Sequence, residues 1–258
     1  MKKMLTALAF ASAMFIGSNV SAQETKPTIV LVHGAFADAS SWNGVIAILE
    51  KDGYPVVAAA NPLRGVKSDA QSVSDIVGGL QSPVVLVGHS YGGNVITDAA
   101  NGHANVKALV YVSAFAPDTG ETAAGLSGKF PGSTLGPTLA PPVKLAGGGT
   151  DLYIRQDRFH DQFATDVPEA QAALMAATQR PVTEYALNEP TSKPAWKTIP
   201  SWHIYGSADK NIPPQAMAFM AARADARKVE VIEGASHVVM VSNPAPVARI
   251  IESAAAAN

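Results

Sequence analysis

The sequence predicts an α/β protein with a doubly wound, mostly parallel sheet. Three observations support this fold class. Short runs of β-branched and apolar residues alternate with helical patterns along the chain. Most of these runs are almost continuously apolar, as expected for strands that are buried on both faces of a parallel sheet. The chain has 258 residues, of which 47% are hydrophobic and 16% charged, so it can form a large core.

Six apolar runs are expected to form the strands, and they cover residues 28–32, 56–60, 84–87, 107–112, 201–205 and 228–232. Helical patterns lie between them. The first helix is predicted from apolar residues at helical spacing, namely Trp42, Val45, Ile46 and Leu49, and it is expected to end at Gly53. This alternation favours parallel strands joined by right-handed crossovers.

Two further helices have recognisable starts. Ser68 and Gln71 have the spacing of a capping box, which predicts a helix that begins there and ends near Leu80. Asn243 followed by Pro244 predicts the N-cap and the first residue of the last helix.

One long stretch interrupts the alternation. Residues 116–150 contain 8 Gly and 5 Pro without a clear period, helical patterns return at 168–178, and the strand pattern returns only at Ile199. A connection of about 80 residues far exceeds an ordinary loop. It could link two domains, but the strand pattern then completes the same alternation. We therefore expect a cap of helices and loops at about 117–198, inserted into a core of about 23–116 and 199–258, and such insertions commonly act as lids.

The first 22 residues have the pattern of a secretory signal peptide. Met1-Lys2-Lys3 is basic, residues 4–17 are apolar, and Val20-Ser21-Ala22 supplies the small residues that a signal peptidase recognises. A membrane anchor would need about 20 apolar residues, and this run is shorter. We expect cleavage after Ala22, export to the periplasm or medium, no stable membrane anchor, and a mature domain at 23–258.

Composition excludes several classes of function. A formal net charge of −2 gives no electrostatic reason for binding nucleic acid or an acidic membrane. The absence of Cys removes disulfides, Cys-based zinc sites and thiol nucleophiles. Composition does not fix the oligomeric state.

The strongest chemical motif is Gly-His-Ser-Tyr-Gly-Gly at residues 88–93. An apolar strand pattern precedes it and a helical pattern follows at 94–100, which is the context that gives Gly-x-Ser-x-Gly its meaning. The turn is so sharp that the residues two before and two after the serine must lack a side chain. Ser90 is therefore predicted to be a nucleophile at a strained backbone position, rather than part of an ordinary strand–helix turn.

A nucleophilic serine needs N–H donors for the oxyanion that forms in the reaction. One is expected to be the N–H of Tyr91, which follows the nucleophile at a helix N-terminus. The other is expected from the loop His33-Gly34-Ala35-Phe36 after the first strand. Ala35 is the first choice and Phe36 the second, and we interpret His33 as a structural brace of this loop.

The general base must be one of six histidines. Only His237 lies late in the chain at the C-terminal end of a strand, which is where this topology requires the base. The others are expected to brace or pack, although one in the cap could contact substrate; they are His33, His89, His103, His160 (in the cap) and His203.

The carboxylate that orients the base should also follow a strand. Asp209 comes after residues 201–205, and Asp118 comes after residues 107–112. We favour Asp209 because its strand neighbours that of His237, and Asp118 is the rival.

The motifs resemble those of the α/β-hydrolase superfamily over nearly the whole mature chain. The resemblance is greatest to the compact esterase-like branch that includes plant methyl esterases, hydroxynitrile lyases and bacterial carboxylesterases. It is carried by His33-Gly34-Ala35-Phe36 with Trp42, by Gly88-His89-Ser90-Tyr91-Gly92-Gly93, by Gly206 with Asp209 and Ile212-Pro213, and by Gly234-Ala235-Ser236-His237.

The resemblance implies a triad of Ser90, Asp209 and His237, with Ala35 and Tyr91 as oxyanion donors. The cap expected at about 117–198 would then be inserted before the strand that carries the triad acid.

Two departures within this resemblance are informative. The stretch from Gln23 to Thr28 leaves no room for the two leading antiparallel strands of the wider superfamily, so we expect six strands, as in the compact branch. The related lyases carry a Lys directly after the triad His, whereas this chain has Val238, which argues against cyanohydrin cleavage.

The sequence thus predicts a serine hydrolase that cleaves small to medium apolar carboxylic esters through an acyl-enzyme, without metal or organic cofactor. Lactone or amide hydrolysis or perhydrolysis on the same triad is an alternative, and so is a non-catalytic ligand-binding protein. About half of the candidate pocket residues are expected to touch substrate; the candidates are Phe36, Tyr91, Phe115, Phe159, Phe163, Trp196, Val238 and Met240.

Overall fold

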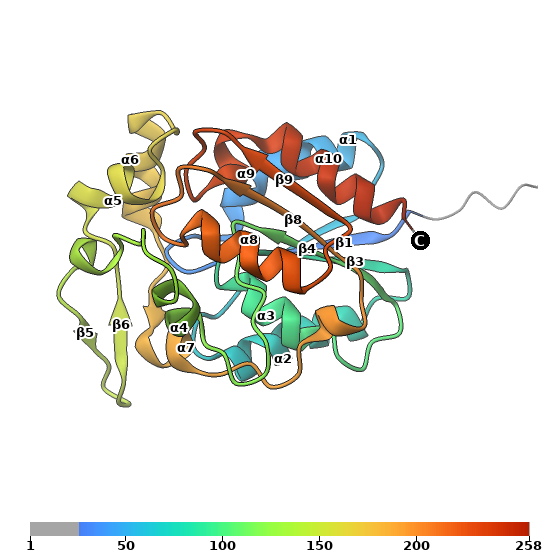
Figure 1. The fold of residues 1–258 in the computed structure, drawn as a ribbon, viewed down its shortest axis with the longest axis horizontal. Coiled ribbons are helices and arrows are strands. Elements are labelled where there is room, and N and C mark those ends of the chain that lie inside the picture. Colours follow the sequence, from blue (N-terminus) through green and yellow to red (C-terminus); the bar gives the residue numbers. More distant parts are fainter. Residues whose placement is uncertain (1–25, 258) are drawn as a thin grey trace, which may run out of the picture.

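The fold is given by a computed structural model that describes residues 26–257. The predicted signal peptide, residues 1–22, lies outside the described residues. A six-stranded sheet forms the centre, and every neighbouring pair in the order β2-β1-β3-β4-β8-β9 is parallel (Figure 1). The six-stranded prediction is confirmed, with strands β1 (Thr28–Val32), β2 (Val56–Ala59), β3 (Val84–His89), β4 (Val106–Val112), β8 (Ser201–Gly206) and β9 (Lys228–Ile232).

Both faces of the sheet are covered by helices, which are α1 (Asn43–Lys51), α2 (Val66–Gly78), α3 (Gly92–Ala99), α8 (Pro214–Arg223), α9 (Val239–Ser242) and α10 (Pro244–Ala255). α1 and α10 pack together on one face, and α2 and α3 pack together on the other (Figure 1). The doubly wound architecture and the start of the last helix at Pro244 are therefore confirmed.

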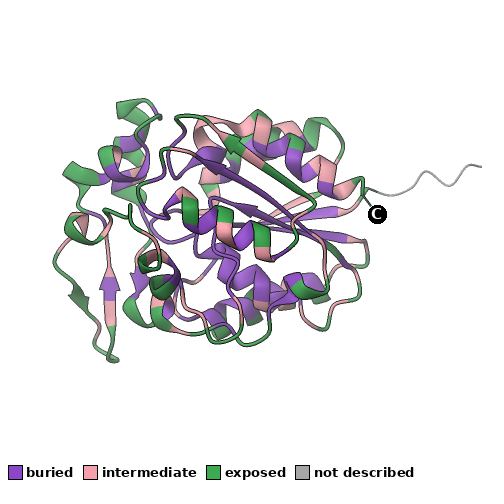
Figure 2. Cartoon of the chain, in the orientation of Figure 1, coloured by how far each residue is buried: buried purple, intermediate pink, exposed green. Residues whose placement is uncertain are grey.

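The inner strands are buried and the outer strands are partly exposed (Figure 2). Every residue of β1, β3 and β8 is buried, as their continuous apolar runs predicted. On the outer strand β9, Val229 and Val231 are 45% and 48% exposed. An outer strand has one neighbouring strand instead of two. Its apolar sequence therefore predicts more burial than the structure shows.

The prediction for the start of α2 is wrong by two residues. The helix begins at Val66, and the Ser68 hydroxyl donates to the carbonyl of Gly65 instead of capping a new helix. The buried carboxylate of Asp69, in the first turn, accepts the main-chain N–H groups of Arg64 and Gly65 just before the helix. The helix also ends at Gly78 rather than near Leu80.

The long connection between β4 and β8, which we call the insert, contains more secondary structure than the sequence predicted. Sequence patterns predicted a helix near α6 but missed three other helices and a small antiparallel sheet of the order β5-β6-β7. Figure 1 shows these elements beside one end of the main sheet. They are α4 (Ala123–Gly128), β5 (Val143–Lys144), β6 (Thr150–Leu152), α5 (Gln156–Phe163), α6 (Glu169–Thr178), β7 (Val182–Thr183) and α7 (Glu184–Asn188).

Candidate active site

Ser90 lies in the sharp turn between β3 and α3. Its φ of +53° is in the left-handed region, which a residue other than glycine rarely adopts. The turn also excludes side chains on either side of it: a Cβ on Gly88 would lie 2.6 Å from the carbonyl oxygen of Gly92, and one on Gly92 would lie 2.5 Å from that of Val32. The strained backbone and the requirement for both glycines agree with the sequence prediction.

Asp209 and His237 form a buried pair at the C-terminal ends of β8 and β9. His237 Nδ1 and Asp209 Oδ2 are 2.6 Å apart, and both side chains are excluded from solvent. The other carboxylate oxygen accepts the main-chain N–H groups of Asn211 at 2.8 Å and Ile212 at 3.0 Å. The carboxylate therefore selects the imidazole tautomer that donates from Nδ1 and leaves Nε2 able to accept a proton.

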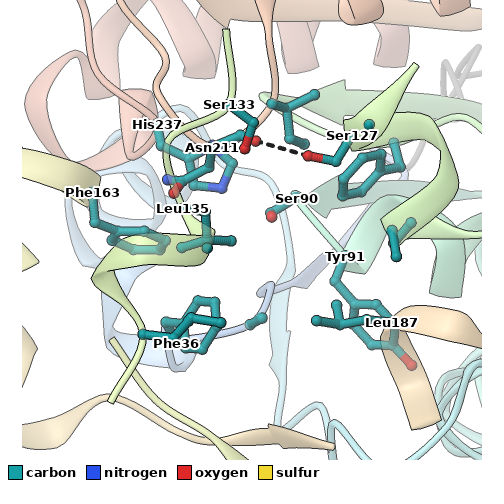
Figure 3. A pocket seen from close by; sticks show the side chains of 18 residues that line it. Phe36, Ser90, Tyr91, Ser127, Ser133, Leu135, Phe163, Leu187, Asn211 and His237 are labelled. Atoms are coloured by element: carbon teal, nitrogen blue, oxygen red, sulfur yellow. Dashed lines mark hydrogen bonds between the residues drawn. The ribbon is translucent and has the colours of Figure 1, made fainter. Parts of the chain in front are cut away.

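Ser90 and His237 line the same cavity, which has a volume of about 250 Å³. In Figure 3, Phe36, Phe163 and Leu135 lie on one side of Ser90, and Tyr91 and Leu187 lie on the other. No Asp, Glu, Lys or Arg contributes to the wall among the described residues. The wall is mostly apolar, with polar side chains at Ser127, Ser133 and Asn211 besides Ser90 and His237.

The predicted oxyanion loop lies directly against the serine. A Cβ on Gly34 would lie 2.5 Å from Ser90 Cβ, so the main chain of this loop approaches the serine closely. The N–H of Phe36 donates to the carbonyl of Arg180 at 3.1 Å, so it is already engaged. Between the two donors that the sequence left open, this contact favours Ala35 over Phe36.

His33 braces the oxyanion loop. Its Nδ1 lies 3.0 Å from the carbonyl of Gly34, and its Nε2 accepts the main-chain N–H of Asn61 at 3.1 Å. The Asn61 side chain returns a hydrogen bond to the carbonyl of His33 at 2.8 Å. Burial lowers the pKa of His33, which keeps the neutral ring that this pairing requires.

The remaining histidines have partners other than a carboxylate. His89 donates from Nε2 to the carbonyl of His237 at 3.1 Å, and burial holds its pKa well below the ordinary value. His203 stacks on Tyr111 with ring centroids 4.7 Å apart. His103 bonds to a serine hydroxyl on α2, and His160 bonds to a main-chain carbonyl of the insert.

Asp118, the rival for the acid, lies away from this arrangement. It forms a partly exposed ion pair with Lys197, which lowers the pKa of its carboxyl. Of the two candidate acids, only Asp209 contacts His237.

Four of the eight candidate pocket residues line the cavity, namely Phe36, Tyr91, Phe115 and Phe163. Phe159 lies behind the wall, with its ring 4.9 Å from that of Phe163. The Trp196 indole donates to the carbonyl of Pro117 at 2.8 Å, away from the cavity. Val238 and Met240 are also buried in the core rather than on the wall.

The insert supplies wall residues that sequence reasoning missed, because most of them are small and none belongs to an apolar period in the sequence. From α4 and the following loop they are Ala123, Ala124, Ser127, Gly128, Ser133, Leu135, Gly136 and Leu139. Leu187 from α7 and Ile212 after Asp209 complete the apolar wall. For Ile212 a sequence signal existed, since it belongs to the block that follows the acid.

Neither a metal centre nor a membrane span is found within residues 26–257. In this part of the chain no three His, Asp or Glu side chains gather in a way that could hold a metal ion. No helix there is both long and apolar enough to cross a membrane.

Comparisons with known proteins find relatives that match most of the chain. The alpha-hydroxynitrile lyase of Arabidopsis thaliana is 26% identical over 86% of this chain and 94% of its own length. Methylesterase 8 of the same plant is 25% identical over 90% and 91%. The crystal structure of polyneuridine aldehyde esterase superposes with a TM-score of 0.75 at 18% identity, covering 88% of this chain and 98% of that one.

A pyrethroid hydrolase from Sphingobium faniae JZ-2 has the same fold, with a TM-score of 0.70 at 22% identity over 90% of this chain and 98% of its own. The family described as the alpha/beta hydrolase family matches residues 29–250. This match spans most of the chain, including the serine turn and the buried Asp–His pair. The protein therefore belongs to the alpha/beta hydrolase family.

Proposed function

We propose that this protein is a carboxylesterase whose triad is Ser90, His237 and Asp209. The observation that carries the proposal is the buried Asp209–His237 pair, whose histidine lines the same cavity as a serine in a strained left-handed turn. The relatives that are named esterases and methylesterases support ester hydrolysis in general. The assignment of the triad rests on the geometry.

The reaction proceeds by two acyl transfers. His237 takes the proton of the Ser90 hydroxyl at Nε2 while the serine oxygen attacks the ester carbonyl, and Asp209 stabilises the imidazolium that forms. The main-chain N–H groups of Ala35 and Tyr91 stabilise the oxyanion. His237 then protonates the leaving alcohol, and a water molecule activated by the same base releases the acid and restores the serine.

The cavity favours uncharged apolar esters of small to medium size. Its wall has no charged Asp, Glu, Lys or Arg among the described residues, so a charged substrate would lose its hydration without compensation. Its volume of about 250 Å³ fits a short acyl or alcohol group better than a long lipid chain. Cyanohydrin cleavage is not favoured, because a buried Val238 follows His237 where the related lyases carry a Lys.

Fluorophosphonate labelling and a series of p-nitrophenyl esters with increasing acyl length test the proposal. We expect wild type to be labelled and to turn over the short esters. Ser90→Ala should lose labelling, and turnover should fall by up to about 10⁶-fold because the acyl-enzyme cannot form. Labelling that persists in Ser90→Ala would remove Ser90 from the mechanism. Tight ligand binding by wild type without turnover would instead support a non-catalytic binding protein.

A further inference from the structure

Tyr91, the residue after Ser90, is anchored through its side chain to a buried carboxylate. Its hydroxyl donates to Asp69 Oδ2 at 2.9 Å, and both side chains are fully buried. Figure 3 shows the Tyr91 ring extending away from Ser90, with the hydroxyl oxygen at the end farthest from it. The hydroxyl therefore lies away from the reacting serine, and the mechanism above does not use it.

Asp69 accepts hydrogen bonds at the start of α2 as well as the one from Tyr91. Asp69 lies in the first turn of α2 and has no cationic partner within the described chain. Its carboxylate accepts the N–H groups of Arg64 at 3.0 Å and Gly65 at 3.4 Å, and at 3.3 Å the Ser68 hydroxyl, which it shares with the Gly65 carbonyl. These three contacts all lie at the start of α2, whereas the fourth partner, Tyr91, belongs to the serine turn.

The peptide group between Ser90 and Tyr91 is the group whose direction matters for the oxyanion. Because that peptide is planar, its carbonyl and its N–H point in opposite directions and turn together. The Ser90 carbonyl is held by the N–H groups of Gly93 at 2.9 Å and Phe115 at 3.2 Å. The Asp69 contact holds the residue at the other end of the same peptide.

The serine turn needs such support. Ser90 has a φ of +53°, and a residue other than glycine keeps that conformation only where its surroundings hold it. If Tyr91 were free to shift, the turn could relax and carry its N–H away from the oxyanion.

We propose that Asp69 is a positioning residue for the reaction at Ser90, because its buried carboxylate anchors Tyr91 and thereby aims the Tyr91 N–H at the oxyanion. This inference rests on the proposed esterase function. Asp69 touches neither substrate nor reacting atoms, and it acts only through Tyr91.

The test compares Tyr91→Phe with Tyr111→Phe as a matched control. Tyr91→Phe removes one hydroxyl and leaves Asp69 its three other donors. Tyr111 is also buried, and its hydroxyl makes one hydrogen bond, at 2.8 Å, to Thr97 outside the cavity.

Each enzyme is titrated with a fluorophosphonate, and kcat per labelled site is measured with p-nitrophenyl butyrate. We expect kcat to fall about tenfold in Tyr91→Phe, which is less than the loss of a whole oxyanion donor. KM should stay within about threefold, and Tyr111→Phe should keep wild-type kcat.

Asp69→Asn and the double variant Asp69→Asn/Tyr91→Phe complete a double-mutant cycle. The cycle distinguishes an effect of Asp69 on catalysis through Tyr91 from an effect on the stability of the fold. Asn at this position places an amide N–H toward the main-chain donors, so Asp69→Asn should lower both kcat and the melting temperature. Because both single variants break the same contact, kcat of Asp69→Asn/Tyr91→Phe should be no lower than that of the slower single variant. Multiplicative losses, or a Tyr91→Phe kcat equal to that of Tyr111→Phe, would overturn the positioning role. That result would leave the Ser90 assignment intact, because labelling of Ser90 is scored independently.

Discussion

Asp209 illustrates how single residues define this site. One carboxylate oxygen accepts two main-chain N–H groups of its own loop, and the other accepts from His237. The carboxylate cannot rotate away from the imidazole without losing the two loop contacts. The orientation of His237 is therefore set by the two hydrogen bonds that Asp209 accepts from residues two and three positions after it in the chain.

Asp209→Asn should reduce kcat/KM by up to about 10⁴-fold, because an amide N–H facing Nδ1 favours the imidazole tautomer that cannot accept the serine proton. Asp118→Asn should change kcat/KM by less than about twofold, since it removes only a partly exposed ion pair with Lys197. Both variants are measured with the same short p-nitrophenyl ester. A larger loss in Asp118→Asn than in Asp209→Asn would transfer the acid role to Asp118.

Motifs led from the sequence to Ser90, Asp209 and His237, because each stands at a strand end within a recognisable local pattern. The role of Asp69 could not be inferred in that way. The spacing of its neighbours Ser68 and Gln71 indicated a capping box, whereas the Asp69 side chain is buried and accepts a hydrogen bond from Tyr91, 22 residues further along the chain. A partner at that distance leaves no periodic signal in the sequence.

At the level of elements, the sheet was predictable and the insert was not. Each predicted strand matches an observed one to within two residues. The inner strands are buried on both faces and therefore require nearly continuous apolar runs, which are easy to find in the sequence. The insert is built from strands of two or three residues and from short helices. α4 consists of Ala, Gly, Leu and Ser, and its buried residues are only Ala123 and Leu126. This is too few apolar residues to form a detectable helical period in the sequence.

The insert is attached to the core through the loop before α2. The guanidinium of Arg64 donates to Asp151 at 2.7 Å and to the carbonyl of Pro181 at 2.8 Å. The Thr183 hydroxyl returns a hydrogen bond to the carbonyl of Arg64 at 2.9 Å. Since the Arg64 N–H also bonds to Asp69, the insert and the serine turn are connected through one short loop.

α4 is expected to limit the length of acyl group that the cavity accepts. Gly128 lines the cavity, does not adopt a positive φ, and has open space where a Cβ would lie. Gly128→Val should therefore be tolerated by the fold and should fill part of the cavity. We expect kcat/KM for p-nitrophenyl octanoate to fall about tenfold or more, with that for the acetate within about threefold, since one or two methylenes carry such selectivity. Equal losses on both esters would show that α4 does not contact the acyl chain.

On the scale of the whole molecule, the core is continuous from the sheet into the insert. One cluster of buried apolar residues includes Val30 and Leu86 of the main sheet together with Leu126, Phe163 and Val182 of the insert. Besides His237 of the candidate site, three histidines are enclosed in this core or beside it, namely His33, His89 and His203. Burial lowers the pKa of each.

These histidines should make the protein sensitive to mild acid. Burial lowers the pKa of His203 from 6.5 to about 3, and unfolding restores the ordinary value. Between these two values the unfolded chain binds more protons than the folded one. The free energy of unfolding is therefore at its full value above about pH 6.5 and decreases as the pH falls toward 3, by up to about 1.4 kcal/mol per pH unit for each such histidine.

His203→Phe isolates one of these contributions. The substitution removes the titrating ring and retains an aromatic ring against Tyr111. His203 Nε2 has no hydrogen-bond partner among the described residues, so the substitution breaks no hydrogen bond there. In urea denaturation, the free energy of unfolding of wild type should decrease between about pH 7 and about pH 5 by roughly 2 kcal/mol more than that of His203→Phe. Other titrating groups, including Asp69, contribute equally to both proteins and cancel in the comparison. Parallel stability curves over this range would mean that His203 accepts a proton in the folded state, which its burial in β8 without a carboxylate should prevent.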